Sequence, residues 1–196
     1  MLRFVAVAVL AVAACMAASV RAHADGSLLG GNCGSAAPVF APWGDDASYY
    51  FPANGGFESG ASGWNLSGGA TVVGGNEPFF LHSSGDSQSL LIPAGGSAST
   101  SVCFGVLYPA LRFVVQGAGA RVHVAVSAKN LLGVVSTLDG GTFTAGGSWA
   151  PSPKLSSLLS AVTSPLGSKS MQVTISVSGA AANIDDLYID PYAFRR

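Results

Sequence analysis

Hydrophobic and polar residues alternate with a period of two along much of the chain after residue 48. The alternation is unbroken over residues 171–177, and it recurs over residues 121–126 and 111–115. Because the side chains of a β-strand point alternately to its two faces, one set of positions in each segment is expected to face a core. The residues predicted to face inward are Met171, Val173, Ile175, Val177, Val122, Val124, Val126, Leu111, Phe113 and Val115.

Several further segments have the composition of strands, and short runs of Gly, Asn, Asp and Ser separate them. Such runs are typical of tight turns. About nine half-buried strands joined in this way indicate an all-β chain folded as an antiparallel β-sandwich. We predict a jelly roll, with an immunoglobulin-like sandwich as the alternative. The further strands are expected at residues 70–73, 79–82, 89–92, 99–104, 133–138 and 184–190.

Two stretches depart from the strand pattern. Residues 155–162 place apolar side chains at helical spacing between flanking prolines, which predicts one short helical segment. Residues 25–48 are rich in Gly, Ala and Pro and predict an irregular N-terminal arm. The arm would precede a single sandwich domain at residues 49–196.

The first 24 residues have the pattern of a cleaved secretory signal peptide. A positively charged start precedes an uncharged run over residues 4–20, and residues 22–24 form a small-x-small cleavage site. Residues 12–15 also resemble the lipobox of bacterial lipoproteins, in which Cys15 would carry a lipid. We expect secretion of the mature chain, which has no transmembrane helix in this interpretation, and anchoring to the cell envelope is the alternative.

Two cysteines, Cys33 and Cys103, remain after the signal peptide is removed. An isolated pair in an oxidising compartment favours one disulfide bond. That bond would attach the Gly-rich arm to the body of the domain.

Composition and motifs restrict the function. Only 10% of the residues are charged and the formal net charge is −1, which excludes the basic surface of a nucleic-acid-binding protein. The chain has no nucleophile-elbow motif and no zinc-ligand spacing. We therefore expect a protein that does not catalyse a reaction, and a polysaccharide hydrolase or lyase is the less favoured interpretation.

The scarce acidic residues stand out near the C-terminus. In the strand expected at residues 184–190, Asp185 shares a face with Leu187 and Ile189 by parity. If that face is the core, the carboxylate is buried, which is unfavourable unless it is paired or bound to a cation. A calcium ion with oxygen ligands would satisfy this carboxylate. Capping of backbone N–H groups at the rim of the sandwich would also satisfy it.

Four short motifs occur in order over residues 54–190: Asn-Gly-Gly-Phe-Glu from Asn54, Gly-Trp at Trp64, His-Ser-Ser-Gly-Asp-Ser from His82, and Ile-Asp-Asp-Leu from Ile184. In this order they resemble the bacterial carbohydrate-binding modules of families four, nine and twenty-two, which are galactose-binding-domain-like jelly rolls. One inserted residue after His82 departs from the family pattern. The composition and the signal peptide also resemble those of small secreted proteins of high-GC bacteria.

The resemblance implies a structural calcium site that joins the first and last strands. Carried over to this sequence, the side-chain ligands would be Glu58 and Asp185, with backbone oxygens near Gly85 and Asp86. Such an ion would stabilise the fold without taking part in chemistry.

The resemblance also implies a polysaccharide or cell-wall glycan as the partner. Trp64 matches a family position that belongs to the core, whereas Trp43 lies outside the matched region and is a candidate anchor at the rim. The polar candidates for a ligand-binding face are Arg112, Arg121, His123 and Gln172. An ordinary solvated sheet surface accounts for the same polar residues. We expect a carbohydrate-binding-like module, and a structural or adhesive cell-envelope protein is the alternative.

Overall fold

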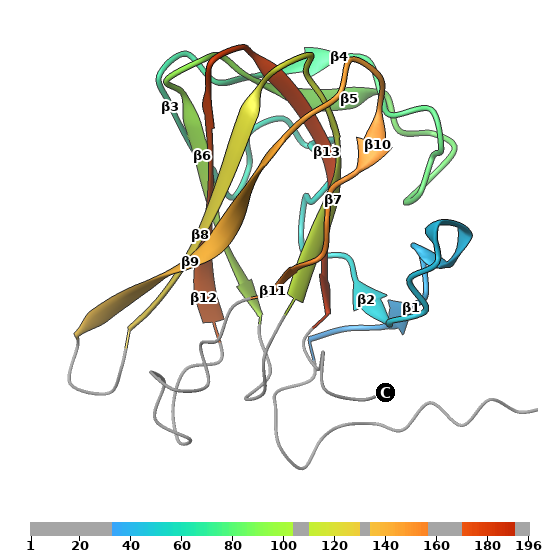
Figure 1. The fold of residues 1–196 in the computed structure, drawn as a ribbon. Coiled ribbons are helices and arrows are strands. Elements are labelled where there is room, and N and C mark those ends of the chain that lie inside the picture. The colour runs from blue at the N-terminus through green and yellow to red at the C-terminus, as the bar shows by residue number, and fades with distance from the viewer. Residues whose placement is uncertain (1–32, 104–109, 130–133, 157–169, 191–196) are drawn as a thin grey trace, which may run out of the picture.

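The computed structural model describes residues 33–103, 110–129, 134–156 and 170–190. Two antiparallel sheets pack face to face in it, which confirms the predicted β-sandwich (Figure 1). The elements are β1 (Ala36–Ala37), the 3-10 helix η1 (Ala41–Trp43), β2 (Tyr49–Tyr50), β3 (Trp64–Ser67), β4 (Thr71–Gly74), β5 (Gln88–Ile92), β6 (Ser97–Cys103), β7 (Ala110–Gln116), β8 (Arg121–Lys129), β9 (Val135–Thr144), β10 (Ala150–Pro151), β11 (Leu155–Ser156), β12 (Ser170–Ser178) and β13 (Ala182–Asp190).

Strand β13 organises the first sheet, which we call sheet A. Its order is β1-β2-β13-β5-β4, and β7 pairs with the other edge of β13 and with β10 and β11. The second sheet, sheet B, has the order β3-β6-β12-β8-β9. No helix in the described part of the chain is long and apolar enough to cross a membrane.

The core between the sheets contains the inward residues that the alternation predicts. Strands β12, β8 and β7 keep a regular alternation, so every second residue faces the core. The confirmed core positions are Met171, Val173, Ile175, Val177, Val122, Val124, Val126, Leu111, Phe113 and Val115. Trp64 is also in this core, 4.9 Å from the ring of Phe57, as expected for the Gly-Trp motif.

The predicted helix at residues 155–162 begins differently from the expectation. Leu155 and Ser156 form β11 and pair with Leu111 and Ala110 of β7, so their backbone is extended. Pairing to a neighbouring strand outweighs the helical spacing of the leucines here. Residues 157–162 lie outside the described residues.

The N-terminal arm covers the outer face of sheet A. Its β1 extends the sheet by pairing with β2, and Phe40 is fully buried with its ring 5.1 Å from Tyr49 and 5.7 Å from Tyr188. Figure 1 shows the arm in blue on the side of sheet A that faces away from sheet B. Sheet A is therefore buried on both faces along much of β7 and β13.

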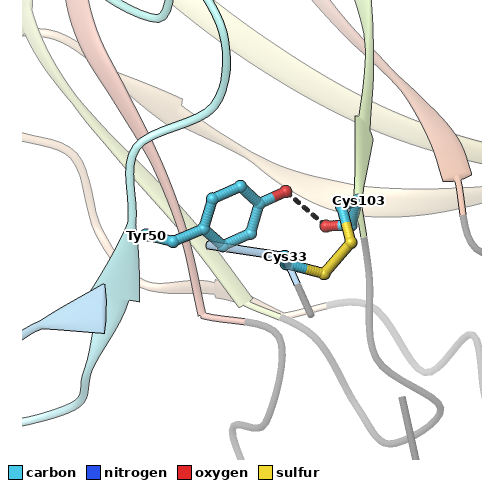
Figure 2. Close-up of a disulfide and its surroundings, with 3 residues drawn as sticks. All are labelled: Cys33, Tyr50 and Cys103. Atoms are coloured by element: carbon cyan, nitrogen blue, oxygen red, sulfur yellow. Dashed lines mark hydrogen bonds between the residues drawn. A yellow bond between two sulfur atoms is a disulfide. The ribbon is translucent and has the colours of Figure 1, made fainter. Parts of the chain in front are cut away.

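A disulfide between Cys33 and Cys103 ties the arm to the end of β6, with 5.4 Å between the Cα atoms. This confirms the predicted pair. The hydroxyl of Tyr50, on β2, donates a hydrogen bond to the backbone oxygen of Cys103, as Figure 2 shows. Because β6 belongs to sheet B and β2 to sheet A, the bond and the tyrosine together join the two sheets at one end of the sandwich.

Replacing both cysteines, by Cys33→Ser with Cys103→Ser, is expected to lower the free energy of unfolding by about 4 kcal/mol. The disulfide closes a sequence separation of 70 residues, and removing it restores conformational freedom to the unfolded chain. Urea unfolding of the oxidised native protein and of the double variant measures the difference. An unchanged midpoint would show that the arm is held by its packing alone.

Candidate functional site

A β-bulge in β13 creates the main polar site of the molecule. The register against β7 shifts between Asp185 and Tyr188, and Asp186 has a positive φ of 48°. Ile184, Leu187 and Ile189 face the core, whereas Asp185 pairs with Val114 on the outer side of sheet A. The parity prediction for Asp185 was therefore wrong about the face, because the bulge interrupts the alternation.

Asp185 is nonetheless fully buried, as are Asp186 and Glu77. The segment before β5 folds over the bulge, so that the backbone N–H of Glu77 donates to Asp185 Oδ2 at 3.1 Å. The N–H of His82 donates to Asp186 Oδ2 at 3.1 Å, and the N–H of Asp186 donates to Asp185 Oδ1 at 2.8 Å. We call Glu77, Asp185 and Asp186 the carboxylate cluster.

Two glycines of the Asn-Gly-Gly-Phe-Glu motif cross directly over this bulge. A Cβ atom on Gly56 would lie 2.8 Å from Asp186 Oδ1, and one on Gly55 would lie 2.8 Å from the backbone oxygen of Leu187. The N–H of Leu187 donates to the oxygen of Gly55 at 3.0 Å. The motif thus allows the chain to approach the cluster more closely than any residue with a side chain could.

Negative charge on Asp185 and Asp186 is unfavourable at this site. Burial, followed by repulsion from Asp186, raises the pKa of Asp185 to about 8. Burial and repulsion from Glu77 raise the pKa of Asp186 to about 7. Asp186 Oδ1 is buried and accepts no hydrogen bond from the described residues.

The expected calcium ligands have different hydrogen-bond partners in the structure. The carboxylate of Glu58 accepts hydrogen bonds from the N–H groups of Ser87 (2.8 Å) and Gln88 (2.7 Å), so it fixes the start of β5. Asp86 lies near the cluster, where its Oδ2 is 2.9 Å from His82 Nδ1. Of the expected side-chain ligands, Asp185 alone is part of the carboxylate cluster.

The chemistry of the cluster suits calcium, which prefers oxygen ligands and carboxylates in particular. No Lys or Arg of the described residues forms an ion pair with its three members. Within the same residues, no three His, Cys, Asp or Glu side chains are arranged to hold a metal ion together. Asp185 and Asp186 are the residues that would hold calcium, with backbone or water oxygens completing the coordination.

A second buried carboxylate, Asp45 of the arm, is compensated in full. Its Oδ2 lies 3.0 Å from Arg112 Nη1 and accepts the hydroxyl of Tyr49 at 2.7 Å. Burial alone would raise the pKa of Asp45, but the hydrogen bonds from Tyr49, Ala47 and Arg112 hold it below its ordinary value. Arg112 also donates to the backbone oxygen of Ser152 and lies over the Phe40 ring. This predicted ligand-binding residue therefore has little surface left for a ligand.

An exposed aromatic surface adjoins the carboxylate cluster. Trp43 of the arm is 38% exposed, and Phe79 and Phe80 are 39% and 47% exposed. The rings of Trp43 and Phe79 meet edge to face, 4.9 Å apart. His82, in the same turn, stacks on Phe51 with the ring centroids 3.9 Å apart. We call Trp43, Phe79 and Phe80 the aromatic surface.

The other predicted ligand-binding residues lie on the outer face of sheet B. Arg121 and Gln172 are exposed there, and the ring of His123 lies between Ser176 Oγ at 3.4 Å and Asp139 Oδ1 at 3.2 Å. This trio has the residue types of a hydrolytic triad. Asp139 is 73% exposed, however, and an orienting carboxylate in such a triad is buried. The aromatic surface and the face of sheet B are separate regions.

Sequence reasoning missed four residues of these sites. Glu77 and Asp186 were not expected to be buried, since their partners lie more than a hundred positions away in the chain. Phe79 and Phe80 were expected within a strand. The sequence feature that could have indicated Asp186 is the pair of consecutive aspartates, Asp185 and Asp186, which lies at the bulge.

No protein-family model and no curated protein matches the chain. Solved structures match it in fold. The tandem CBM22 domain from Paenibacillus barcinonensis Xyn10C is 17% identical with a TM-score of 0.50, covering 74% of this chain and 45% of that one. The enzymatically active domain of bacteriophage CBA120 tailspike protein 4 is 14% identical with a TM-score of 0.51, covering 70% and 20%.

The structure of TmCBM61 in complex with β-1,4-galactotriose is 21% identical with a TM-score of 0.47, and the match covers 73% of this chain and 96% of that chain. Carbohydrate-binding modules are thus among the neighbours of this jelly roll. At these identities the likeness shows the fold, and the function must be argued from the sites.

Arg112→Ala is expected to lower the free energy of unfolding by about 3 kcal/mol, because it removes the cation hydrogen-bonded to the buried Asp45 and leaves, of the described residues, only Lys154, 4.0 Å away. The matched control is Arg121→Ala, which removes an exposed arginine of sheet B and should change stability by less than about 0.5 kcal/mol. Urea unfolding of both variants measures the two effects. Equal, small changes would mean that the arm does not depend on this ion pair.

Proposed function

We propose that the protein is a secreted, non-catalytic glycan-binding module whose ligand lies on the aromatic surface. The observation that carries the proposal is the contact between the exposed rings of Trp43 and Phe79, with the exposed Phe80 next in the chain. These three are among the five exposed large hydrophobic residues of the described chain, and they come from two segments far apart in the sequence. Exposed apolar side chains gathered in this way are typical of a binding site.

The chemistry of this surface fits a sugar ring. A pyranose presents an apolar C–H face that packs on an aromatic ring, and hydroxyl groups around its edge that need polar partners. Trp43 and Phe79 supply ring surfaces at an angle of 76° to each other. His82, whose side chain is partly exposed and hydrogen-bonded to Asp86, is a polar side chain of the segment that carries Phe79 and Phe80. Few convergent polar groups beside aromatic walls are the usual composition of a small-molecule site.

The disulfide supports secretion. A bond between Cys33 and Cys103 persists in an oxidising compartment, and the signal pattern of residues 1–24 leads to such a compartment. The signal itself lies outside the described residues.

Trp43→Ala and Phe79→Ala are each expected to weaken glycan binding at least tenfold, because each removes one of two facing rings. Affinity electrophoresis against soluble β-1,4-galactan, xylan and mixed-linkage glucan measures the retardation of each protein. His123→Ala, on the outer face of sheet B, is the control and should migrate like the native protein. Retardation lost in His123→Ala but kept in Trp43→Ala would move the site to sheet B, and free migration of the native protein in every gel would contradict the glycan proposal.

The carboxylate cluster supports the second part of the proposal, a structural calcium ion. Such an ion would offset the charge that burial makes unfavourable on Asp185 and Asp186, and it would give Asp186 Oδ1 a partner. It would hold β13 to the segment before β5 and take no part in chemistry.

Calcium at 100 times its dissociation constant is expected to stabilise the native protein by about 2.7 kcal/mol, and a chelator should reverse the effect. Asp186→Asn should abolish the response while leaving the calcium-free protein at least as stable as the native one, since it removes one buried charge. Asp139→Asn, an exposed control, should keep the response. Thermal unfolding with calcium and with chelator measures all three proteins, and a native protein that melts identically in both would exclude the calcium site.

A further inference from the structure

The two phenylalanines of the aromatic surface lie in a segment whose pattern predicts a strand. In a strand over residues 79–82, Phe79 and Leu81 would point to one side and Phe80 to the other. The structure has a turn there instead, so this strand prediction was wrong. Phe79 and Phe80 are both exposed, whereas Leu81 packs against the small cluster of Phe40, Tyr49 and Tyr188.

Glu77 is the physical cause of the turn. Its carboxylate accepts the backbone N–H of Phe79 on Oε2 and that of Leu81 on Oε1, the second at 2.7 Å. In a strand, these two N–H groups would donate hydrogen bonds to a neighbouring strand. The Glu77 side chain therefore competes directly with sheet formation. Two hydrogen bonds to an ionised carboxylate are stronger than two between neutral groups.

The same turn is anchored to β13 at both ends. The N–H of Glu77 donates to Asp185 Oδ2, and the N–H of His82 donates to Asp186 Oδ2, each at 3.1 Å. Between these anchors the backbone at Phe80 has a positive φ of 51°. That conformation is unfavourable for a phenylalanine and persists only where surrounding contacts impose it.

We propose that Glu77 is a positioning residue for glycan binding, since its carboxylate folds the turn that places the Phe79 ring against Trp43. The inference rests on the proposed function. Glu77 is fully buried and cannot contact a ligand itself. It acts through the backbone of the turn, which brings the Phe79 ring to 4.9 Å from Trp43.

The role requires a carboxylate and not merely a polar group. Both oxygens of Glu77 accept a backbone N–H. Glutamine has one oxygen, and its NH₂ group would face an N–H donor in place of the second. Glu77→Gln therefore preserves the shape of the side chain and removes one of the two bonds that hold the turn.

The test compares Glu77→Gln with Thr100→Val. Thr100 is also buried, and its hydroxyl donates to the backbone oxygen of Gly63 at 2.9 Å on sheet B, remote from the aromatic surface. Both variants lose one buried hydrogen bond between a side chain and the backbone, so both should lose some stability. Only Glu77→Gln should change the aromatic surface.

Two readouts are needed. The first is the nuclear Overhauser effect between the rings of Trp43 and Phe79, which reports the surface without any ligand. The second is the dissociation constant, by calorimetry, for whichever polysaccharide the native protein retains on affinity gels. Glu77→Gln is expected to lose the ring contact and to bind at least tenfold more weakly, while Thr100→Val keeps the contact and binds within twofold of the native protein.

Retention of the ring contact and of full affinity in Glu77→Gln would overturn the inference. A loss of affinity in Thr100→Val equal to that in Glu77→Gln would also overturn it, because the effect would then follow general stability. Both variants are measured with calcium and with chelator, and a loss confined to the calcium samples would assign the effect to metal binding.

Failure of the proposed function gives a different result. If the native protein binds no glycan, the ring contact still shows whether Glu77 builds the turn. If Glu77→Gln does not fold, Glu77→Asp keeps the charge but shortens the side chain by one methylene, so it cannot reach both N–H groups. A ring contact intact in Glu77→Asp would contradict the positioning role.

Discussion

The burial of the outer face of sheet A is the constraint on which the rest of the structure depends. A two-layer sandwich leaves one face of each sheet in water, but here β7 and β13 are buried on both faces. The arm and the turn before β5 cover that outer face with Phe40, Tyr49 and Leu81. Every polar group that remains under this cover needs a partner, because an unsatisfied buried group is unfavourable by about 1–3 kcal/mol.

The two buried carboxylate sites meet this requirement in opposite ways. Asp45 has Arg112, Tyr49 and a backbone N–H, so its charge is stabilised and the site is complete. Asp185 and Asp186 of the carboxylate cluster accept hydrogen bonds from backbone N–H groups, but burial and repulsion between carboxylates raise the pKa of both. A protein with few charges has placed three carboxylates in one buried position without a cation from the described residues. The first site therefore has its charges paired within the described residues, and the second is where we propose a calcium ion.

Much of the fold could be predicted from the sequence, because β12, β8 and β7 are regular antiparallel strands with one apolar face. Parity within such a strand is a local property, so it survives in any tertiary context. The disulfide was also predictable, since Cys33 and Cys103 are the two of the three cysteines that lie outside the segment expected to be a signal peptide. The motif that carries the resemblance to carbohydrate-binding modules includes Gly55 and Gly56, but their close approach to β13 appears only in the structure, where they pass over the bulge at Asp186.

The sites could be predicted less well, because the interactions that shape them interrupt local patterns. Alternation predicts a strand at Phe79, and the carboxylate of Glu77, two positions earlier, removes it. Parity places Asp185 with Leu187, and the bulge at Asp186 separates them. Both departures occur at the same place in the fold. The Glu77 carboxylate bonds to the backbone two and four residues later, whereas Asp185 and Asp186 bond to a backbone more than a hundred residues away. A hydrogen bond between segments so far apart in the chain produces no periodic pattern in the sequence, whereas a strand does.

The aromatic surface belongs to the same two segments, the arm and the turn before β5, that cover sheet A. Neither the arm nor the turn is a long regular element, so contacts beneath each one determine where its rings lie. Phe40 and Asp45 hold the arm in place. Glu77 and β13 hold the turn. The buried polar side chains therefore determine the positions of the exposed rings, although they are not exposed themselves. Binding residues on loops usually depend on a rigid scaffold, and here the scaffold reaches the loops through carboxylates and not through packing alone. In the function that we propose, a change to one buried oxygen alters recognition while the sandwich, whose core lies on the other face of sheet A, stays intact.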